Sequence, residues 1–228
     1  MYNIYNNYDW LRVGITEAVM ERMPHKGYLV LKRGMDFGLA VILVVILSPV
    51  MLLIAVLIKL DSRGPVVFRQ KRTGYRGEVF EIWKFRSMAV GNDYCGAADD
   101  RYTRVGRLLR KASLDELPQL FNILVGKMSF VGPRPWVVEY YENMNARERQ
   151  RVLVRPGLTG LAQAKGRNGL TVFEKIDYDL EYVEKCSFWL DIRIVLMTVR
   201  MVFMPKWAEA GKAGVNNEIE CLRRRRGV

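Results

Sequence analysis

The sequence is poor in the residues from which many catalytic and structural sites are built. It has a single histidine, His25, and three cysteines, Cys95, Cys186 and Cys221. An odd number of cysteines without the spacing of metal ligands argues against a disulfide scaffold and against a zinc site. A lone histidine with no evident partner set argues against a Ser/His triad. Three common classes of site are thereby set aside.

Acidic residues are also in short supply relative to basic ones. The chain has 36 lysines and arginines against 24 aspartates and glutamates, which gives a formal net charge of +12. Such a charge attracts phosphates of any kind, whether in nucleic acid, anionic lipid or nucleotide, and does not choose among them. With 228 residues, half of them hydrophobic, the chain suffices for one core and is short for two independent domains. We expect one compact unit with appendages.

Charge is missing altogether from residues 37–58, which read FGLAVILVVILSPVMLLIAVLI. This is roughly the length that a bilayer-spanning helix requires. The segment lies too far from the N-terminus for an ordinary signal peptide, and no A-x-A-like cleavage site follows it. The sequence therefore predicts a segment that stays in the membrane.

Ser48 and Pro49 interrupt this segment near its middle. Pro49 cannot donate a hydrogen bond to the carbonyl of Val45, so a kink or break is expected there, with Ser48 covering the freed backbone group. Basic residues flank the segment on both sides, and the positive-inside bias favours the cytoplasm for both flanks. A re-entrant helix-break-helix satisfies both observations. A kinked helix that spans the bilayer remains an alternative on physical grounds.

Elsewhere the sequence predicts an α+β fold, mostly helical, with a small β-hairpin. Alternation around Gly74 and Gly77 indicates two short strands. The glycine-rich segment RPGLTGLAQAKGRNG indicates a binding loop rather than a helix. The expected elements are strands within 65–88, an exposed loop at 89–102, helices at 103–126 and 136–151, the binding loop at 155–169, and a helix at 187–204 that lies on protein or on the membrane surface.

Adjacent carboxylates, Asp115 and Glu116, are the first candidates for chemistry. Ser113-Leu-Asp-Glu116 fits the capping-box pattern, and a helix N-terminus suits phosphate binding. Four cations precede the pair and could grip a pyrophosphate, and two carboxylates among phosphates invite Mg²⁺. The purely structural alternative is that Ser113 caps, Glu116 completes the box and Asp115 complements the helix dipole. The four cations are Arg104, Arg107, Arg110 and Lys111.

Several isolated cations are further candidates, each weak by itself. Arg134 lies between Pro133 and Pro135, which lowers the entropy cost of presenting its guanidinium to an anion. Arg167 lies in a Gly-Arg-Asn-Gly segment typical of phosphate-binding loops. Lys84, in an apolar and aromatic run, is either a buried cation with a purpose or one that snorkels to water.

Taken together, these segments resemble the bacterial sugar transferase family, the monotopic phosphoglycosyl transferases that act on undecaprenyl phosphate. The resemblance runs from about Lys32 to Met204 and is carried most specifically by SLDELPQL and MSFVGPRP. It implies the minimal catalytic form, because larger relatives carry a further multi-helix membrane region. The remaining matching segments are KRGMDFGLA, FRQKRTGYRGEVFEIWKFRSM, TRVGRLLRKA, VRPGLTGLAQAKGRN and DLEYVEKCSFWLD.

The resemblance implies a location and an organisation. The expected parts are a variable lead-in (1–26), a re-entrant membrane helix with its break at Ser48 and Pro49 (27–61), a cytoplasmic catalytic domain (62–204) and a basic tail (205–228). Interfacial amphipathic helices would rest on the cytoplasmic face of the bacterial inner membrane. Neither the sugar nor the glycan can be named, and a homodimer is left open.

The resemblance also implies a reaction. Asp115 would attack the sugar-linked phosphate of a UDP-sugar, release UMP and form a covalent phosphosugar intermediate that undecaprenyl phosphate then attacks. Glu116 would assist, and Mg²⁺ held at Asp115 would offset charge repulsion. Downstream glycosyltransferases would use the product in glycan or glycoprotein assembly. By matching position, the substrate- or phosphate-binding residues implied are Lys84, Arg110, Arg134, Arg167, Asp179 and Asp191.

The sequence departs from the family pattern at two positions, and three other functions compete with the one implied. Leu161 stands where many relatives have tryptophan and Lys165 where asparagine is frequent, so the loop that would touch the sugar or lipid is altered. A membrane-tethered protein that binds nucleic acid or anionic lipid without catalysis would use the charge but would need no SLDE or GPRP block; nucleic acid is not expected as a partner. A catalytically inactive scaffold disagrees with the intact carboxylate pair. A glycosyltransferase that moves sugar alone would release UDP.

Overall fold

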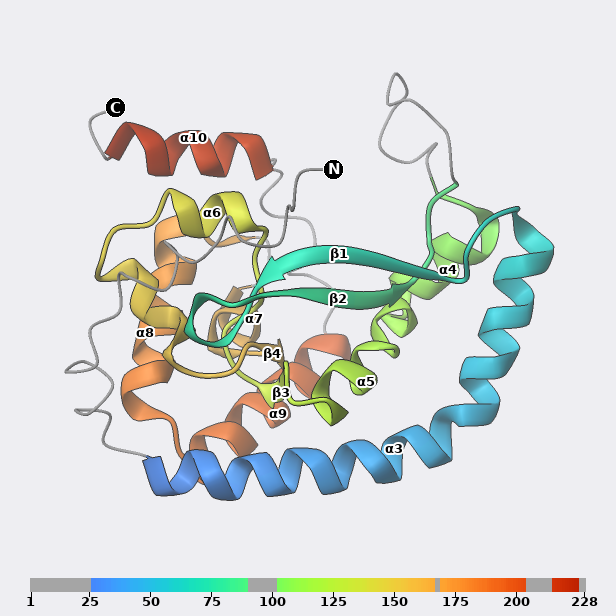
Figure 1. Cartoon of the computed structure of the whole chain (residues 1–228), viewed down its shortest axis with the longest axis horizontal. Helices are drawn as coiled ribbons and strands as arrows, with labels where there is room; N and C mark the ends of the chain where they lie inside the picture. Colours follow the sequence, from blue (N-terminus) through green and yellow to red (C-terminus); the bar gives the residue numbers. More distant parts are fainter. Residues whose placement is uncertain (1–25, 90–101, 167–168, 204–214, 226–228) are drawn as a thin grey trace, which may run out of the picture. The chain divides into compact units, whose positions relative to one another are not determined.

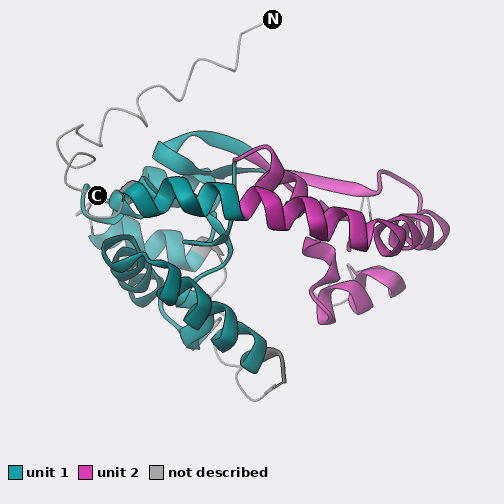
Figure 2. Cartoon of the chain, turned by 90° about the horizontal axis from the view of Figure 1, so that it is seen from below, with its two compact units in different colours: residues 1–35, 71–80, 127–228 teal, residues 36–70, 81–126 magenta. Residues whose placement is uncertain are grey.

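The computed structural model describes residues 26–89, 102–166, 169–203 and 215–225. The fold is α+β and mostly helical, with two small two-stranded sheets, as the sequence predicted in class. The chain forms two compact units: unit 1 comprises residues 1–35, 71–80 and 127–228, and unit 2 comprises residues 36–70 and 81–126 (Figure 2). The predicted lead-in at 1–26 and the predicted loop at 89–102 fall almost wholly outside the described residues.

Helix α3 (Lys26–Asp61) contains the uncharged segment and continues through Pro49. Within its unit 2 part the helix changes direction sharply (Figures 1 and 2), as a proline inside a helix would cause. The hydroxyl of Ser48 donates a hydrogen bond of 2.8 Å to the carbonyl of Val45, the acceptor that Pro49 cannot serve. The predicted kink and the predicted role of Ser48 are confirmed. The helix bends but does not end, because α3 continues to Asp61.

Most of the large apolar side chains of α3 are exposed. Residues 27–61 form the one helix, within the described part of the chain, that is long and apolar enough to cross a membrane. Leu52, Leu53 and Leu60 are exposed by 68%, 58% and 80%. A helix that buried these side chains in protein would expose far fewer of them, so an apolar surrounding such as lipid suits it.

The predicted hairpin is present as strands β1 (Val67–Thr73) and β2 (Val79–Phe85). The 3₁₀ turn η2 (Tyr75–Gly77) joins them, and Gly77 adopts the left-handed backbone that favours glycine, with φ of 79°. The amide of Gly74 donates to the carbonyl of Glu78 and closes the turn. The glycine punctuation of the sequence thus predicted the place of the turn.

Unit 2 continues with α4 (Arg104–Lys111), the 3₁₀ turn η4 (Leu114–Glu116) and α5 (Gln119–Leu124). The sequence predicted one helix here, and the structure divides it because Ser113 takes a left-handed conformation. The side chain of Thr103 accepts a hydrogen bond from the amide of Gly106 and caps α4. The core of the unit packs Ile54 and Ile58 of α3 against Leu109 of α4 and Phe85 of β2.

Unit 1 contains a second sheet that the sequence did not reveal. Strands β3 (Ser129–Val131) and β4 (Gly157–Thr159) pair in parallel, with Ser129 opposite Gly157. Strands this short leave little alternation to detect. The helical elements around them are α6 (Val138–Glu142), the 3₁₀ segment η5 (Glu148–Leu153), α7 (Leu161–Gly166), α8 (Val172–Lys185), α9 (Phe188–Phe203) and α10 (Val215–Arg225).

Two sequence predictions in unit 1 were wrong and one was confirmed. The expected helix at 136–151 is broken into α6 and η5, because Asn145 and Glu148 exchange hydrogen bonds between side chain and backbone and start a new turn. The expected binding loop at 155–169 contains β4 and α7, since the glycine-free stretch LAQAK can form a helical turn. Helix α9 lies where a helix at 187–204 was predicted.

Helix α10 is part of the core of unit 1, although the sequence suggested a basic tail. Ile219 and Leu222 are buried with Tyr140 and Val172 in one apolar cluster. Glu218 accepts hydrogen bonds from the Tyr140 hydroxyl and the Lys175 ammonium. The amphipathic pattern of residues 215–225 was therefore a packing signal, hidden by the run of arginines with which the helix ends.

Candidate functional site

The two candidate carboxylates lie in the short turn η4, between α4 and α5 of unit 2. Ser113, which precedes the turn, has φ of 57° and makes no capping hydrogen bond with its side chain. The predicted capping box at Ser113–Glu116 is therefore wrong, since Ser113 is left-handed and not in the extended conformation typical of a capping residue. Glu116 pairs with Lys84 instead, and the cap-only interpretation of this motif loses its basis.

Asp115 is buried, with only 5% of its surface exposed. Burial raises the pKa of its carboxyl above the usual range, Lys84 opposes this rise, Glu116 adds to it and Arg110 opposes it. Among the described residues, no other side chain donates a hydrogen bond to Asp115. A desolvated carboxylate whose oxygens are not engaged by neighbouring side chains is well suited to act as a nucleophile.

Lys84 resolves the choice that the sequence left open. Its ammonium is 2.6 Å from a carboxylate oxygen of Glu116, and both side chains are about four-fifths buried, with exposed fractions of 18% and 20%. The lysine therefore pairs rather than snorkels to water. Because the same positive charge also lowers the pKa of Asp115, Lys84 serves both carboxylates at once.

Asn122 is a residue at this site that the sequence analysis missed. Its side-chain oxygen accepts the amide N–H of Trp83 at 3.0 Å, and its side-chain nitrogen donates to the carbonyl of Glu81 at 2.8 Å. These two bonds hold β2 against α5, and Lys84 is the next residue along β2. The sequence feature that could have revealed Asn122 is its spacing from Asp115 and Gln119, since these three polar residues are about one helical turn apart. The structure shows that all three are buried.

Gln119 adds a donor in the same buried row. It is 2% exposed, and in the described part of the chain its side-chain nitrogen has no hydrogen-bond partner. Unsatisfied buried donors are uncommon in folded proteins.

Arg110 is exposed at the end of α4, and its guanidinium lies 5.3 Å from the centre of the Tyr102 ring. Lys84, Arg110, Asp115 and Glu116 are thus grouped in unit 2.

The other predicted residues belong to unit 1. Arg134 is exposed in the Pro-Arg-Pro turn, and its carbonyl accepts a hydrogen bond of 2.7 Å from Arg151. Arg151 also forms a buried ion pair of 2.5 Å with Asp179 and stacks 4.2 Å from the ring centre of Trp136. Asp179 therefore acts on the Arg134 turn through Arg151. Burial raises the pKa of Asp179, and Arg151 opposes the rise.

The Arg134 turn is held by unusually close backbone contacts to the loop that contains β4. The amide of Gly132 donates to the carbonyl of Thr159, and the amide of Gly157 donates to the carbonyl of Pro133. A Cβ atom on Gly132 would lie 2.3 Å from the carbonyl oxygen of Arg155, and one on Gly157 would lie 2.1 Å from the nitrogen of Gly132. These glycines are required for contact between two backbones rather than for a phosphate.

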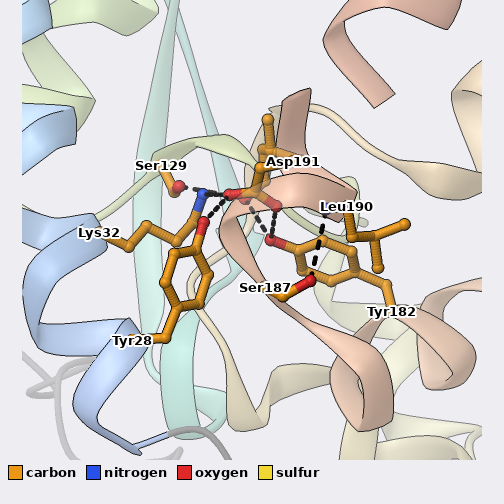
Figure 3. A network of polar contacts seen from close by, with 8 residues as sticks. Tyr28, Lys32, Ser129, Tyr182, Ser187, Leu190 and Asp191 are labelled. Atoms are coloured by element: carbon orange, nitrogen blue, oxygen red, sulfur yellow. Dashed lines mark hydrogen bonds and ion pairs between the residues drawn. The ribbon is translucent and has the colours of Figure 1, made fainter. Parts of the chain in front are cut away.

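Asp191 lies at the start of α9 in a buried polar network. Figure 3 shows Tyr28 and Lys32 of α3 and Tyr182 of α8 pointing toward its carboxylate. The Tyr28 and Tyr182 hydroxyls donate to it at 2.6 Å and 2.7 Å, and the Lys32 ammonium pairs with it as well. With both oxygens engaged, the carboxylate joins the first turns of α3 to α9 and α8.

The structure therefore brings together only part of the predicted set. Arg134, Asp179 and Asp191 lie in unit 1, where both aspartates are engaged by protein side chains, and Arg167 falls outside the described residues. In the described part of the chain, no group of three or more His, Cys, Asp or Glu side chains could hold a metal. Mg²⁺ would not need such a group, because it commonly binds through one or two carboxylates and substrate phosphates.

An apolar cavity of about 410 Å³ lies within unit 2. Its walls come from the bent part of α3, from the hairpin and from the first turn of α5. Trp83 and Pro118 in its wall are close in sequence to Lys84 and Glu116. The lining residues are Val44, Ser48, Met51, Leu52, Ala55, Val66, Val67, Arg69, Trp83, Phe85, Pro118 and Phe121.

Comparison with known proteins gives a consistent family. Residues 27–205 match the family described as bacterial sugar transferase. UDP-glucose:undecaprenyl-phosphate glucose-1-phosphate transferase of Xanthomonas campestris pv. campestris is 45% identical over 195 residues, which cover 79% of this chain and 40% of the relative. The N-acetylgalactosaminephosphotransferase of Aeromonas hydrophila, named for UDP-N-acetylgalactosamine and undecaprenyl phosphate, is 42% identical over 79% of this chain and 45% of its own length.

A relative of more similar length occurs in Caulobacter vibrioides. It is also named UDP-glucose:undecaprenyl-phosphate glucose-1-phosphate transferase and is 45% identical over 181 residues, which cover 74% of this chain and 68% of the relative. The chain thus spans less than half the length of the Xanthomonas and Aeromonas relatives. The relatives are named for different sugars, so identity at this level does not indicate one donor.

Proposed function

Because this chain belongs to the bacterial sugar transferase family, we propose that it transfers a sugar phosphate from a UDP-sugar to undecaprenyl phosphate. The observation that carries the proposal is Asp115, a buried carboxylate free of other side-chain donors, beside a Glu116 that is paired with Lys84. The reaction would take place at the cytoplasmic face of the bacterial inner membrane. Its product would start a surface glycan or glycoprotein that downstream glycosyltransferases extend.

In the first half of the reaction, an oxygen of Asp115 attacks the phosphorus that carries the sugar. The bond from that phosphorus to the oxygen of UMP breaks, and UMP leaves with the bonding electrons. The sugar phosphate is then held covalently as an acyl phosphate on Asp115. Covalent catalysis of this kind divides one difficult displacement into two easier ones. Lys84, which opposes the rise in the pKa of Asp115, favours the ionised carboxylate that makes this attack.

In the second half, a phosphate oxygen of undecaprenyl phosphate attacks the same phosphorus. The bond to Asp115 breaks, the carboxylate is regenerated, and a polyprenol diphosphosugar is released. Glu116, held by Lys84, would position the incoming phosphate or accept a proton from a reactant. Arg110, the α4 cation that lowers the pKa of Asp115, would supply positive charge to the transferred phosphate, since phosphoryl transfer depends mainly on electrostatic stabilisation.

Mg²⁺ is proposed as the cofactor, with Asp115 and the donor's phosphate oxygens as ligands. When bound, it would reduce the repulsion between the carboxylate and the pyrophosphate. The engaged state of Glu116, which is paired with Lys84 at 2.6 Å, leaves Asp115 as the protein ligand with oxygens to offer. Most of the coordination sphere would then be substrate and water, as is common for this ion.

Two features support a lipid acceptor. The exposed apolar surface of α3 suits insertion into a bilayer, and the bend in the part of the helix that contains Pro49 suits a re-entrant helix with both ends in the cytoplasm. The apolar cavity beside that bend has walls suited to an isoprenoid chain. An acceptor that enters from the membrane could thus meet a donor that arrives from water.

The decisive experiment is product analysis with the protein in nanodiscs. A panel of UDP-sugars is supplied with and without undecaprenyl phosphate, and UMP and UDP are separated. We expect lipid-dependent release of UMP, and a protein mass increased by one sugar phosphate when the lipid is withheld. Release of UDP would contradict the proposal and indicate a glycosyltransferase that moves sugar alone.

Matched variants assign the nucleophile. Asp115→Asn should lose both the covalent adduct and turnover by at least ~10³-fold, since removal of a nucleophile abolishes the pathway. Asp177→Asn, which alters an exposed carboxylate of α8 paired with Arg147, should keep both. An adduct that survives in Asp115→Asn would place the nucleophile elsewhere.

A further inference from the structure

Helix α4 has two faces of opposite character. At 100° per residue, Arg104, Arg107, Leu108 and Lys111 fall within an arc of about 100° on one side of the helix. All four side chains are exposed, and Leu108 is exposed by 69%. The sequence of α4 contains no acidic residue. This outer face of α4, defined by these four residues, combines three cations with one large apolar side chain.

The opposite face fixes the rotation of the helix. Leu109 is buried against Ile54 and Ile58 of α3. A Cβ atom on Gly106 would lie 2.0 Å from the carbonyl oxygen of Ser87, so the two backbones are in close contact there. Because the inner face cannot leave these partners, the outer face points away from the core of unit 2.

The start of α4 is joined to the end of α3, the helix that exposes apolar side chains. The amide of Val105 donates a hydrogen bond of 3.0 Å to the carboxylate of Asp61, the last residue of α3. Leu60, next to that anchor, is exposed by 80%. Helix α4 therefore begins at the end of α3 and packs back along it toward Ile54.

We propose that the outer face of α4 docks on the headgroups of anionic phospholipids. Given the proposed insertion of α3 in the membrane, on which this inference rests, the anchor at Asp61 puts α4 at the level of the headgroups. Cations that surround an exposed leucine match such a boundary, since Leu108 can enter the apolar edge while the cations reach the phosphates. Each Lys or Arg near an anionic surface strengthens binding by about fivefold.

The phosphates of a UDP-sugar are a second source of the same chemistry, and the geometry favours the lipid. Arg110 lies outside the arc, about 60° beyond Arg107 around the helix. It is also the α4 cation that lowers the pKa of Asp115. The cation that senses the candidate site is thus separate from the three on the outer face.

The test uses a fluorescent probe on the outer face of the full chain in nanodiscs. Leu108→Cys is labelled in a background of Cys95→Ser and Cys221→Ser, while Cys186 is retained because its buried thiol is out of reach. Brominated phosphatidylglycerol and brominated phosphatidylcholine are compared as quenchers at equal mole fraction. We expect quenching, and a preference for the anionic lipid.

Two double variants make the test specific. Arg104→Gln with Arg107→Gln should lower the preference for phosphatidylglycerol by about fivefold for each cation removed, or until the two lipids quench equally. Arg223→Gln with Arg224→Gln removes the same charge from the exposed end of α10 and should leave the preference unchanged.

Two results would overturn the inference. Absence of quenching by either lipid would mean that the outer face lies in water, and equal quenching by both with all three cations in place would mean that it does not select anionic headgroups. Displacement of the anionic lipid by UDP-sugar would assign the face to the soluble donor instead. No turnover is needed for this readout, so failure of the transferase assay and failure of this inference are separate outcomes.

Discussion

At the scale of single residues, the burial of Asp115 lowers the stability of the folded protein, and the proposed chemistry requires that burial. A buried carboxyl without side-chain donors is harder to ionise, which is why its pKa is raised. Lys84 limits that rise while it pairs with Glu116. The same lysine thus favours the ionised form of Asp115.

Replacement of Lys84 should therefore change the pH dependence of the reaction. In Lys84→Met the pKa of Asp115 rises further, because burial is then opposed only by Arg110 and by the backbone hydrogen bond of Asp115. Since the ionised carboxylate is the nucleophile, the acidic limb of the pH–rate profile should move to higher pH. Lys127→Met, which removes an exposed lysine paired with Glu78, is the control and should leave that limb in place.

Asp115→Asn should raise stability while it removes activity. A carboxyl whose pKa is raised by folding stabilises the protein below its unfolded pKa, and that contribution is lost as pH rises through the folded value. At pH 7 the ionised Asp115 is therefore unfavourable, and a neutral amide is better tolerated. Thermal unfolding in detergent should show a higher midpoint for the variant at pH 7 and a shrinking difference toward pH 4.

The opposite sign is expected for Glu174 of α8. Its capping bonds to the backbone and hydroxyl of Thr171 lower its pKa. A lowered folded pKa contributes stability that is present above the unfolded value and lost in acid. Glu174→Gln should therefore lower the unfolding midpoint at pH 7, and equal shifts in both variants would contradict this account of Asp115.

Asp179 should matter far more for stability than its neighbour Asp177. Asp179→Asn leaves the Arg151 guanidinium buried without its counter-charge, which typically costs ~3–5 kcal/mol. Asp177→Asn breaks an exposed pair with Arg147 and should cost at most about 1 kcal/mol. Denaturant unfolding of the two variants measures both values. Comparable losses would mean that the buried pair is not the anchor of the Arg134 turn.

At the scale of elements, the bend in α3 decides whether both ends of the helix reach the same side of a bilayer. A cysteine next to the start of α3, at Gly27, and one just after its end, at Arg63, should be labelled from the same side in the native helix. Pro49→Ala restores a straight hydrogen-bonding pattern, and should move labelling toward opposite sides. Opposite labelling in the native helix would identify a kinked span.

Ser48→Ala provides the matched control for that experiment. It removes only the hydroxyl that donates to Val45 and leaves proline in place, so the topology should persist with a stability loss of about 1 kcal/mol.

Particular elements show how far the sequence alone could lead. Long or well-punctuated patterns were sufficient: the uncharged run of α3, the glycines of the hairpin and the periodicity of α9 each indicated the correct element. The capping box was misplaced because Ser113 and Thr171 have the same local pattern, and only the left-handed turn at Ser113 distinguishes them. Local pattern does not reveal backbone conformation that tertiary packing selects.

The residues proposed for the chemistry of the candidate site could be predicted from the sequence. The residues that hold them in place, such as Asn122, could not. Asp115 and Glu116 were found through motif resemblance, and Lys84 through an unusual charge in an apolar run. Asn122 contacts β2 from 39 residues away, so no short-range pattern could reveal its partner. Long-range polar contacts of this kind become visible only when the chain is folded.

At the scale of the whole molecule, the C-terminal helix extends the fold beyond the family match, which ends at residue 205. Leu222 of α10 is 1% exposed within the core of unit 1. Leu222→Ala should therefore cost ~2–5 kcal/mol in the free energy of unfolding. Cys221→Ala, at an exposed neighbouring position, should be nearly neutral. A small loss in Leu222→Ala would mean that α10 is an appendage.

The close approach of the two glycine-containing loops has a consequence for large-scale mutagenesis. A methyl group at Gly132, Gly157 or Gly160 would meet backbone atoms at 2.1–2.3 Å, so even alanine forces the loops apart. An activity screen would score these positions as intolerant as Asp115. A parallel screen for protein abundance would separate them, because a glycine variant disappears from the cell whereas an inactive Asp115 variant accumulates.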